Sequence, residues 1–130
     1  TYTNKVSSTG VIASNTSGAG TARSLPGAAS FGGDKGIFCC GYDGSQTNMT
    51  NIVSNSGVVA SDVTVSGVSV REGPGASGYG GDKACFAYGE GTPSNTNVKI
   101  LISSSGVVSA DAAGVGSARA GLIAAEFYLI

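Results

Sequence analysis

The chain has 130 residues, of which 22 are glycine and only 12% are charged, and its net charge is −1 at pH 7. This length fits one domain. The sequence contains no histidine, which excludes Ser-His-Asp or Cys-His catalysis and any histidine-bound metal supplied by this chain. Seven basic and eight acidic residues give no basic surface for nucleic acid or for an anionic membrane, so we expect neither partner.

A repeat of about 48 residues organises the sequence. The tetrapeptide at 32–35, Gly-Gly-Asp-Lys, recurs at 80–83, and the three arginines of the chain, Arg23, Arg71 and Arg119, are evenly spaced. Ser-Asn-Ser-Gly-Val-Val at 54–59 returns as Ser-Ser-Ser-Gly-Val-Val at 103–108 and as Ser-Ser-Thr-Gly-Val-Ile at 7–12. We therefore divide one repeat-built domain, 1–130, into a half repeat (1–22), two repeats (23–70 and 71–118) and a terminal strand (119–130).

Each repeat is predicted to contain two β-hairpins. The chain begins in a hairpin of the second type, over 2–14. In the repeat that follows, apolar segments at 25–31 and 36–42 flank a Gly-Gly-Asp turn, where glycine supplies the positive φ that a hairpin turn needs. Segments at 49–54 and 58–65, rich in β-branched residues, flank Asn-Ser-Gly. Because no window shows apolar spacing of 3.6 residues, we expect few helices or none.

Four short strands every 40–50 residues are typical of the blades of a β-propeller. Small residues at 28–29, 76 and 124–125 suit an inner strand, where large side chains would clash. A β-sandwich or a β-solenoid built from the same hairpins is the alternative.

The sequence from Arg23 through Ala28-Ala29-Ser30-Phe31-Gly32-Gly33-Asp34-Lys35 to Gly41-Tyr42-Asp43-Gly44-Ser45 resembles a kelch repeat. The phrases GGDKGIF, NIVSNSGVVASD and GVGSAR are similar to repeats in tail-fibre and other virion proteins of environmental bacteriophages. The resemblance implies an all-β chain of about 2.7 four-stranded, kelch-like propeller-type repeats. The double glycine after the second strand and the tryptophan of the fourth, both usual in kelch repeats, do not occur here.

A propeller has about 4–8 blades, so we expect these repeats to be completed by neighbouring subunits. Exposed strand edges recruit other chains, and a head-to-tail contact gives a ring or a filament. The alternative is that the chain is a fragment of a longer protein. The strands expected to carry assembly contain Tyr2, Val6, Leu122, Phe127, Tyr128 and Ile130.

The charged residues of the repeat have structural interpretations. Asp34-Lys35 and Asp82-Lys83 occupy equivalent turns, where an aspartate caps the turn and the lysine is solvated. The three arginines are interpreted as anchors of loops or of neighbouring blades rather than as anion sites. Loop aspartates with no clustered partner make only a weak case for calcium, and they are Asp43, Asp62 and Asp111.

The remaining candidate sites are of three kinds. Tyrosines that could stack on a sugar, or simply pack, are Tyr42, Tyr79 and Tyr88. Asn15 and Asn48 begin Asn-X-Ser/Thr acceptor patterns for glycosylation. The cysteines have no metal-ligand spacing and are expected to be buried free thiols, at Cys39, Cys40 and Cys85.

The repeat pattern predicts a non-catalytic, self-assembling structural protein without a cofactor. The resemblance implies that it is a subunit of a phage tail fibre, a virion or an extracellular filament. Its loops would be available for a glycan or a host-surface receptor. The alternative function is a lectin-like carbohydrate-binding propeller module. An enzyme ranks third, because no general base stands near a nucleophile.

Overall fold

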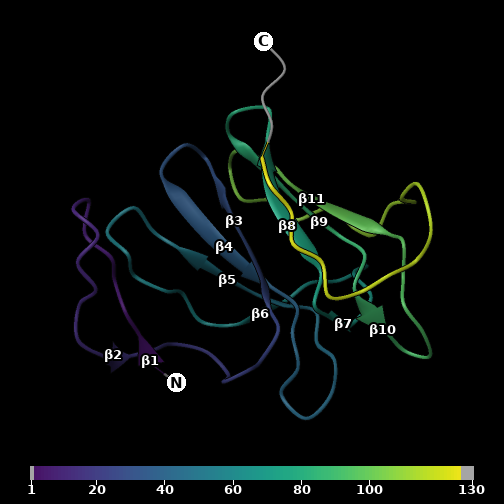
Figure 1. Ribbon diagram of the computed structural model, residues 1–130, viewed down its shortest axis with the longest axis horizontal. Coiled ribbons are helices and arrows are strands. Elements are labelled where there is room, and N and C mark those ends of the chain that lie inside the picture. The colour runs from purple at the N-terminus through teal and green to yellow at the C-terminus, as the bar shows by residue number, and fades with distance from the viewer. Residues whose placement is uncertain (1, 127–130) are drawn as a thin grey trace.

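The computed structural model describes residues 2–126, and over these residues the protein is all-β (Figure 1). Among them there is no helix, and so none that is long and apolar enough to cross a membrane. The strands in this range are β1 (Tyr2–Thr3), β2 (Thr16–Ser17), β3 (Gly27–Phe31), β4 (Lys35–Cys39), β5 (Met49–Val53), β6 (Val63–Thr64), β7 (Arg71–Glu72), β8 (Gly75–Tyr79), β9 (Lys83–Ala87), β10 (Glu90–Gly91) and β11 (Lys99–Ile102).

The strands form several small antiparallel sheets, none of which closes on itself. The first repeat (23–70) contributes a sheet in the order β3-β4-β5-β6, and the second repeat (71–118) a sheet in the order β11-β9-β8. Strands β1 and β2 of the half repeat (1–22) pair with each other, as do β7 and β10. In Figure 1 the two larger sheets lie side by side, with the half repeat and the second repeat on opposite sides of the first repeat.

The first hairpin of each full repeat follows the prediction. Strands β3 and β4 pair from Phe31↔Lys35 at the turn, and β8 and β9 from Tyr79↔Lys83. Both glycines of each Gly-Gly-Asp-Lys turn have positive φ, which only glycine adopts without strain. Lys35 Nζ lies 2.6 Å from Asp34 and Lys83 Nζ 3.0 Å from Asp82, so these charged pairs belong to the turns.

The turn of the second hairpin occurs three times with one hydrogen-bond pattern. The backbone N–H of Ser7 donates to the carbonyl of Val11, and the hydroxyl of Ser7 accepts the backbone N–H of Val11. Ser54 and Ser103 bond in the same way to Val58 and Val107. The half repeat is therefore built like the second half of each full repeat.

The last strand of the repeat is shorter than predicted. Instead of an extended segment over 58–65, only Val63–Thr64 is strand, paired with Met49 and Thr50, and Val59 makes an isolated bridge to Val53. The side chain of Asp62, which lies between them, accepts hydrogen bonds both from Thr21 and from Asn51 of β5. The strand pairing with β5 is thus interrupted between Val59 and Val63, where the Asp62 side chain joins β5 to Thr21 of the half repeat.

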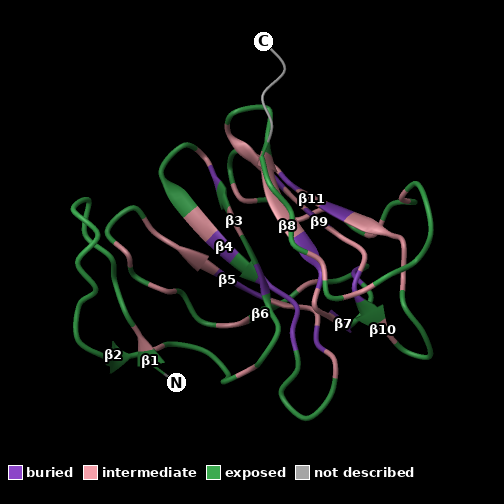
Figure 2. Cartoon of the chain, viewed as in Figure 1, coloured by how far each residue is buried: buried purple, intermediate pink, exposed green. Residues whose placement is uncertain are grey.

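The core lies where the sheets of the two full repeats face each other (Figure 2). Strand β3 packs against both β8 and β9. The buried apolar side chains on this joint are Phe31, Ile37 and Cys39 from the first repeat and Ala84, Phe86, Ile100 and Ile102 from the second. A Cβ atom at Gly27 would lie 2.8 Å from the Phe86 ring, so the two sheets are too close at this point for any residue larger than glycine.

The predicted terminal strand is wrong over its described part. Residues 119–126, the C-terminal segment, contain no strand, because no strand among residues 2–126 pairs with them. The segment instead packs on β8, where a Cβ atom at Gly75 would lie 3.2 Å from Leu122 Cβ. The assembly residues Phe127, Tyr128 and Ile130 lie outside the described residues.

Candidate docking groove

Two phenylalanines at equivalent positions have different surroundings. Phe38 on β4 and Phe86 on β9 are 48 residues apart, and each is paired across its hairpin with an alanine, Ala28 or Ala76. Phe86 is fully buried against β3 of the first repeat. Phe38 is 37% exposed. Burying an aromatic ring stabilises a protein by about 1.5–3 kcal/mol, so the exposed ring marks an uncovered face.

The uncovered face extends beyond one side chain. In the second repeat, Phe86 pairs with Ile100, and both are fully buried. In the first repeat, Phe38 pairs with Asn51, whose amide is buried and hydrogen-bonded, and Val53 is half-buried nearby. The first repeat therefore presents a less apolar and less covered version of the same sheet face.

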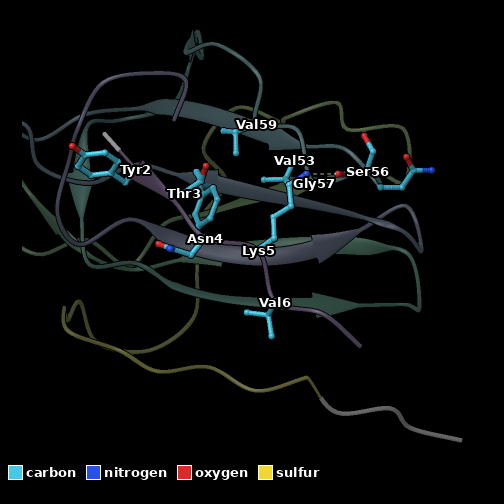
Figure 3. A pocket seen from close by; sticks show the side chains of 11 residues that line it. Tyr2, Thr3, Asn4, Lys5, Val6, Val53, Ser56, Gly57 and Val59 are labelled. Atoms are coloured by element: carbon cyan, nitrogen blue, oxygen red, sulfur yellow. Dashed lines mark hydrogen bonds between the residues drawn. The ribbon is translucent and has the colours of Figure 1, made fainter. Parts of the chain in front are cut away.

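A groove lies over this face, between β1 and the sheet of the first repeat (Figure 3). Its main part encloses about 530 Å³, and an adjoining part of about 310 Å³ extends toward Arg23 and Pro26. We call the two parts together the Phe38 groove, because Phe38 lines both. Other lining residues of the main part include Tyr2, Lys5, Val6, Val53, Gly57 and Val59.

The closed joint between the two full repeats shows what fills the corresponding space. A Cβ atom at Gly106 would lie 3.1 Å from the Phe31 ring and 3.3 Å from Ile52 Cδ1. At the equivalent Gly57, the nearest atoms belong to Lys5, whose Nζ donates to the carbonyl of Ser56 at 2.9 Å. Lys5 thus takes the place of Ile52, and no phenylalanine from 2–126 takes the place of Phe31. In the closed joint, the space that corresponds to the groove holds the Phe31 ring of β3.

The half repeat also exposes apolar side chains around the groove. Tyr2 is 73% exposed, Val6 64% and Ile12 68%, although Val6 and Ile12 bridge each other across the hairpin. Figure 3 shows Tyr2 and Val6 at separate points along the groove, with Lys5 reaching toward the Ser56–Gly57 turn. The structure therefore places both predicted N-terminal assembly residues at the groove.

One arginine in each full repeat binds distant parts of that repeat together, as expected of a loop anchor. Arg71 is completely buried and forms an ion pair with Asp111, whose other oxygen accepts the N–H of Ser69 at 2.8 Å. Arg23 pairs with Asp62 at 3.4 Å, and Asp62 accepts the N–H of Thr21 at 2.7 Å. Both full repeats thus share one motif, in which an aspartate pairs with the arginine and also accepts the backbone N–H of the residue two positions before that arginine.

The half repeat holds an uncharged version of this motif. Asn51 donates to the carbonyl of Ala60 and to Asp62, and Asn4 donates in the same way to the carbonyl of Ala13 and to Asn15. Asn15 is thus the counterpart of Asp62. This relation is visible in the phrases Val-Ile-Ala-Ser-Asn and Val-Val-Ala-Ser-Asp, and the sequence analysis missed it.

The local hydrogen bonds set the electrostatics of Asp62. The amide of Asn51, the hydroxyl and N–H of Thr21 and the charge of Arg23 together lower the pKa of Asp62, with the Asn51 bond the largest cause. Asp62 and Asp111 form ion pairs with Arg23 and Arg71, and Asp43 caps its own loop by accepting the N–H of Ser45. Within residues 2–126, no group of three or more potential ligand side chains could hold a metal ion.

The three tyrosines that were considered either for sugar stacking or for packing do not form one surface. Tyr79 lies beside the Gly-Gly-Asp-Lys turn, whereas Tyr88 follows the other end of the same hairpin. Tyr88 is also engaged structurally, because Arg119 stacks on its ring at 3.9 Å and its hydroxyl donates to the Val115 carbonyl. Tyr42, at 41% exposure, is the most accessible of the three, since Tyr79 is 37% exposed and Tyr88 half-buried.

The two glycosylation acceptors differ in accessibility. Asn15 is exposed. The amide of Asn48 donates to the carbonyls of Val65 and Val68, at 3.0 and 2.9 Å, and these bonds would have to break before a sugar could be attached. All three cysteines are free thiols, with Cys39 and Cys40 buried and Cys85 half-buried. The predicted burial is therefore confirmed for two of them.

No family model matches the chain, and no curated protein matches it in sequence. The groove must therefore be interpreted from the geometry of the chain itself.

Proposed function

We propose that the chain is a non-catalytic structural protein whose copies join head to tail through the Phe38 groove. The observation that carries the proposal is the difference between Phe38, 37% exposed, and its counterpart Phe86, which the neighbouring repeat buries completely. Inside the chain, repeats already associate by stacking one sheet face on the next. A second copy that stacks in the same way extends an existing mode of packing.

The surface that fits the groove is the C-terminal segment of another copy. Ile123 occupies the repeat position of Gly27, which is the residue that meets Phe86 in the closed joint. Ile123 is 99% exposed, so its side chain has nothing to pack against within residues 2–126. Since isoleucine is larger than glycine, the joint between copies needs more room, and the groove of about 530 Å³ provides it.

A contact between two different surfaces is not self-limiting. Because the groove and the C-terminal segment lie on different repeats, each copy retains one free surface after it binds a neighbour. Such head-to-tail association gives a ring if the rotation closes and a filament if it does not. The repeats in this proposal are blades of the propeller type, consistent with face-to-face stacking and with the kelch-like sequence.

This architecture suits a subunit of a phage tail fibre, a virion or an extracellular filament, as the sequence resemblance implies. The exposed loops after β4 and β9 are then available for a glycan or a host-surface receptor. Nucleic acid and membranes are not partners in this proposal, and the protein acts at a virion surface or outside the cell.

Light scattering over a range of protein concentrations tests the proposal. Wild-type protein is expected to grow in mass with concentration, and Phe38→Asp to remain at the monomer mass of about 12.6 kDa. Val107→Asp serves as the matched control, because Val107 is also exposed but lies outside both surfaces, and it should assemble like the wild type. A wild-type protein that stays monomeric at every concentration contradicts the proposal.

A further inference from the structure

The adjacent cysteines Cys39 and Cys40 lie at the end of β4, and neither contributes to the Phe38 groove. Their Sγ atoms are 3.0 Å apart, and both side chains are completely buried. A covalent S–S bond measures about 2.05 Å, so about 1 Å of further approach would join the two atoms. The rest of the site already holds them in this arrangement.

The backbone at this point is fixed on both sides. Cys40 has a φ of 65°, its N–H donates to the carbonyl of Met49, and its own carbonyl accepts Arg23 Nε at 2.7 Å. The next residue, Gly41, donates to the carbonyl of Arg71 in the second repeat. Tyr88, the counterpart of Cys40, has nearly the same φ of 64°. The repeat therefore imposes this positive φ at the position of Cys40, whether the side chain there is cysteine or tyrosine.

The surroundings make one thiol the nucleophile. The hydrogen bond between Cys39 and Cys40, supported by the charges of Arg71 and Arg23, lowers the pKa of Cys40 despite its burial and the nearby Asp111. The same hydrogen bond, together with burial, raises the pKa of Cys39. Cys40 is thus the more easily ionised of the two thiols, and Cys39 is the thiol that can condense with it. Oxidation of a cysteine depends on thiolate character and on access, so the nearby arginines favour reaction at Cys40, whereas its complete burial restricts reaction to an oxidant small enough to enter.

We propose that Cys39 and Cys40 form a reversible vicinal disulfide when the protein meets a small oxidant such as hydrogen peroxide. The Cys40 thiolate attacks one peroxide oxygen, the O–O bond breaks, and sulfenic acid and hydroxide form. The proton that Cys40 released on ionising neutralises this hydroxide and gives the first water. Cys39 sulfur then attacks the sulfenic sulfur, the S–O bond breaks, and the oxygen leaves with the Cys39 thiol proton as the second water. Overall, two thiols and one peroxide give one disulfide and two waters.

The disulfide is expected to be easily reduced. Consecutive Cα atoms are about 3.8 Å apart, below the roughly 4.4–6.8 Å usual for disulfides. Strained disulfides have more oxidising potentials and belong to the labile or regulatory group. Its position beside Gly41 places the redox change at the joint between the two repeats.

Mass spectrometry with iodoacetamide tests the proposal, and Cys85 serves as an internal control. Burial raises the pKa of Cys85, and no second sulfur bonds to it in the described chain. After peroxide treatment and removal of the peroxide, protein that is denatured in the presence of iodoacetamide should carry one carbamidomethyl label, at Cys85. With prior reduction by dithiothreitol it should carry three. A mapped Cys39–Cys40 peptide lighter by two hydrogen atoms completes the expected result.

Two variants separate the vicinal disulfide from other oxidation. Cys85→Ala should oxidise like the wild type and carry no label until it is reduced. Cys39→Ala combined with Cys40→Tyr reproduces the Ala87-Tyr88 pair of the second repeat and should carry one label under both conditions. Three labels on peroxide-treated wild-type protein overturn the proposal, and so does oxidation of the pair to sulfinic or sulfonic acid without a link.

Discussion

The two sheet faces that contain Phe38 and Phe86 come from one repeated sequence and differ mainly in what covers them. Phe86 meets β3 so closely that only glycine fits at position 27, and it is fully buried. Phe38 faces a groove lined in part by a half repeat. Equivalent residues therefore have different energetic roles, because burial depends on the neighbouring repeat and not on the repeat itself.

Truncation of the two phenylalanines should separate these roles most strongly. Phe86→Ala leaves a cavity in the joint and is expected to lower the free energy of unfolding by about 3–5 kcal/mol. Phe38→Ala removes a ring that is already partly in water, and we expect a loss of about 1 kcal/mol. Denaturant unfolding of both variants measures the difference, and equal losses would contradict the comparison.

The arginine motif gives the next largest effect. Removing Arg71 leaves Asp111 without its partner in a buried setting, so Arg71→Met is expected to cost about 3 kcal/mol or more. Arg23 pairs with Asp62, whose side chain retains 23% exposure, and Arg23→Met should cost about 1–2 kcal/mol. Thermal unfolding should therefore rank Arg71→Met well below Arg23→Met. The reverse order would show that burial of the pair does not set its contribution.

Substitution of the two closely packed glycines, Gly27 and Gly75, should likewise cost more stability at the joint between the repeats than at the C-terminal segment. An added methyl group at Gly27 meets the Phe86 ring and Pro74 at 2.8 and 3.0 Å, and Gly27→Ala is expected to cost about 1–3 kcal/mol. At Gly75 the neighbour is Leu122, at 3.2 Å, in the unpaired C-terminal segment, which can shift. Gly75→Ala should therefore cost less than about 1 kcal/mol. Urea unfolding distinguishes a rigid joint from an adjustable one.

The smallest expected effect is a pH dependence from Asp62. Its pKa is lowered in the folded protein, so it binds a proton more weakly there than in the unfolded chain, where the value is about 3.9. Its contribution is present above about pH 4 and is lost as the pH falls through the folded value. The difference in melting temperature between wild type and Asp62→Asn should thus shrink from pH 6 toward about pH 2. A constant difference would mean that the carboxylate is not the source.

Much of the fold was predictable because the repeat consists of turn residues. Gly32 and Gly33, Ser54 and Gly57 specify local geometry, and local geometry is what a single sequence encodes most directly. The terminal strand was not predictable, because a strand exists only when another strand pairs with it. Residues 122–126 have a strand-like pattern but find no such strand within residues 2–126.

The candidate site was predictable only in part. Tyr2 and Val6 were identified as assembly residues from their position in the half repeat, but Phe38 was not, because its sequence context matches that of the buried Phe86. Exposure of one and burial of the other follow from contacts between repeats. The Asn15 counterpart of Asp62 could have been found by aligning the three copies of the hairpin.

The most direct test of the docking contact mixes two variants. Phe38→Asp blocks the groove, and Ile123→Asp blocks the C-terminal segment, so each variant alone should sediment as a monomer. An equimolar mixture retains one intact groove and one intact segment, and it should form dimers that do not grow further. A mixture that stays monomeric, or either variant assembling alone as the wild type does, would contradict head-to-tail docking through the Phe38 groove.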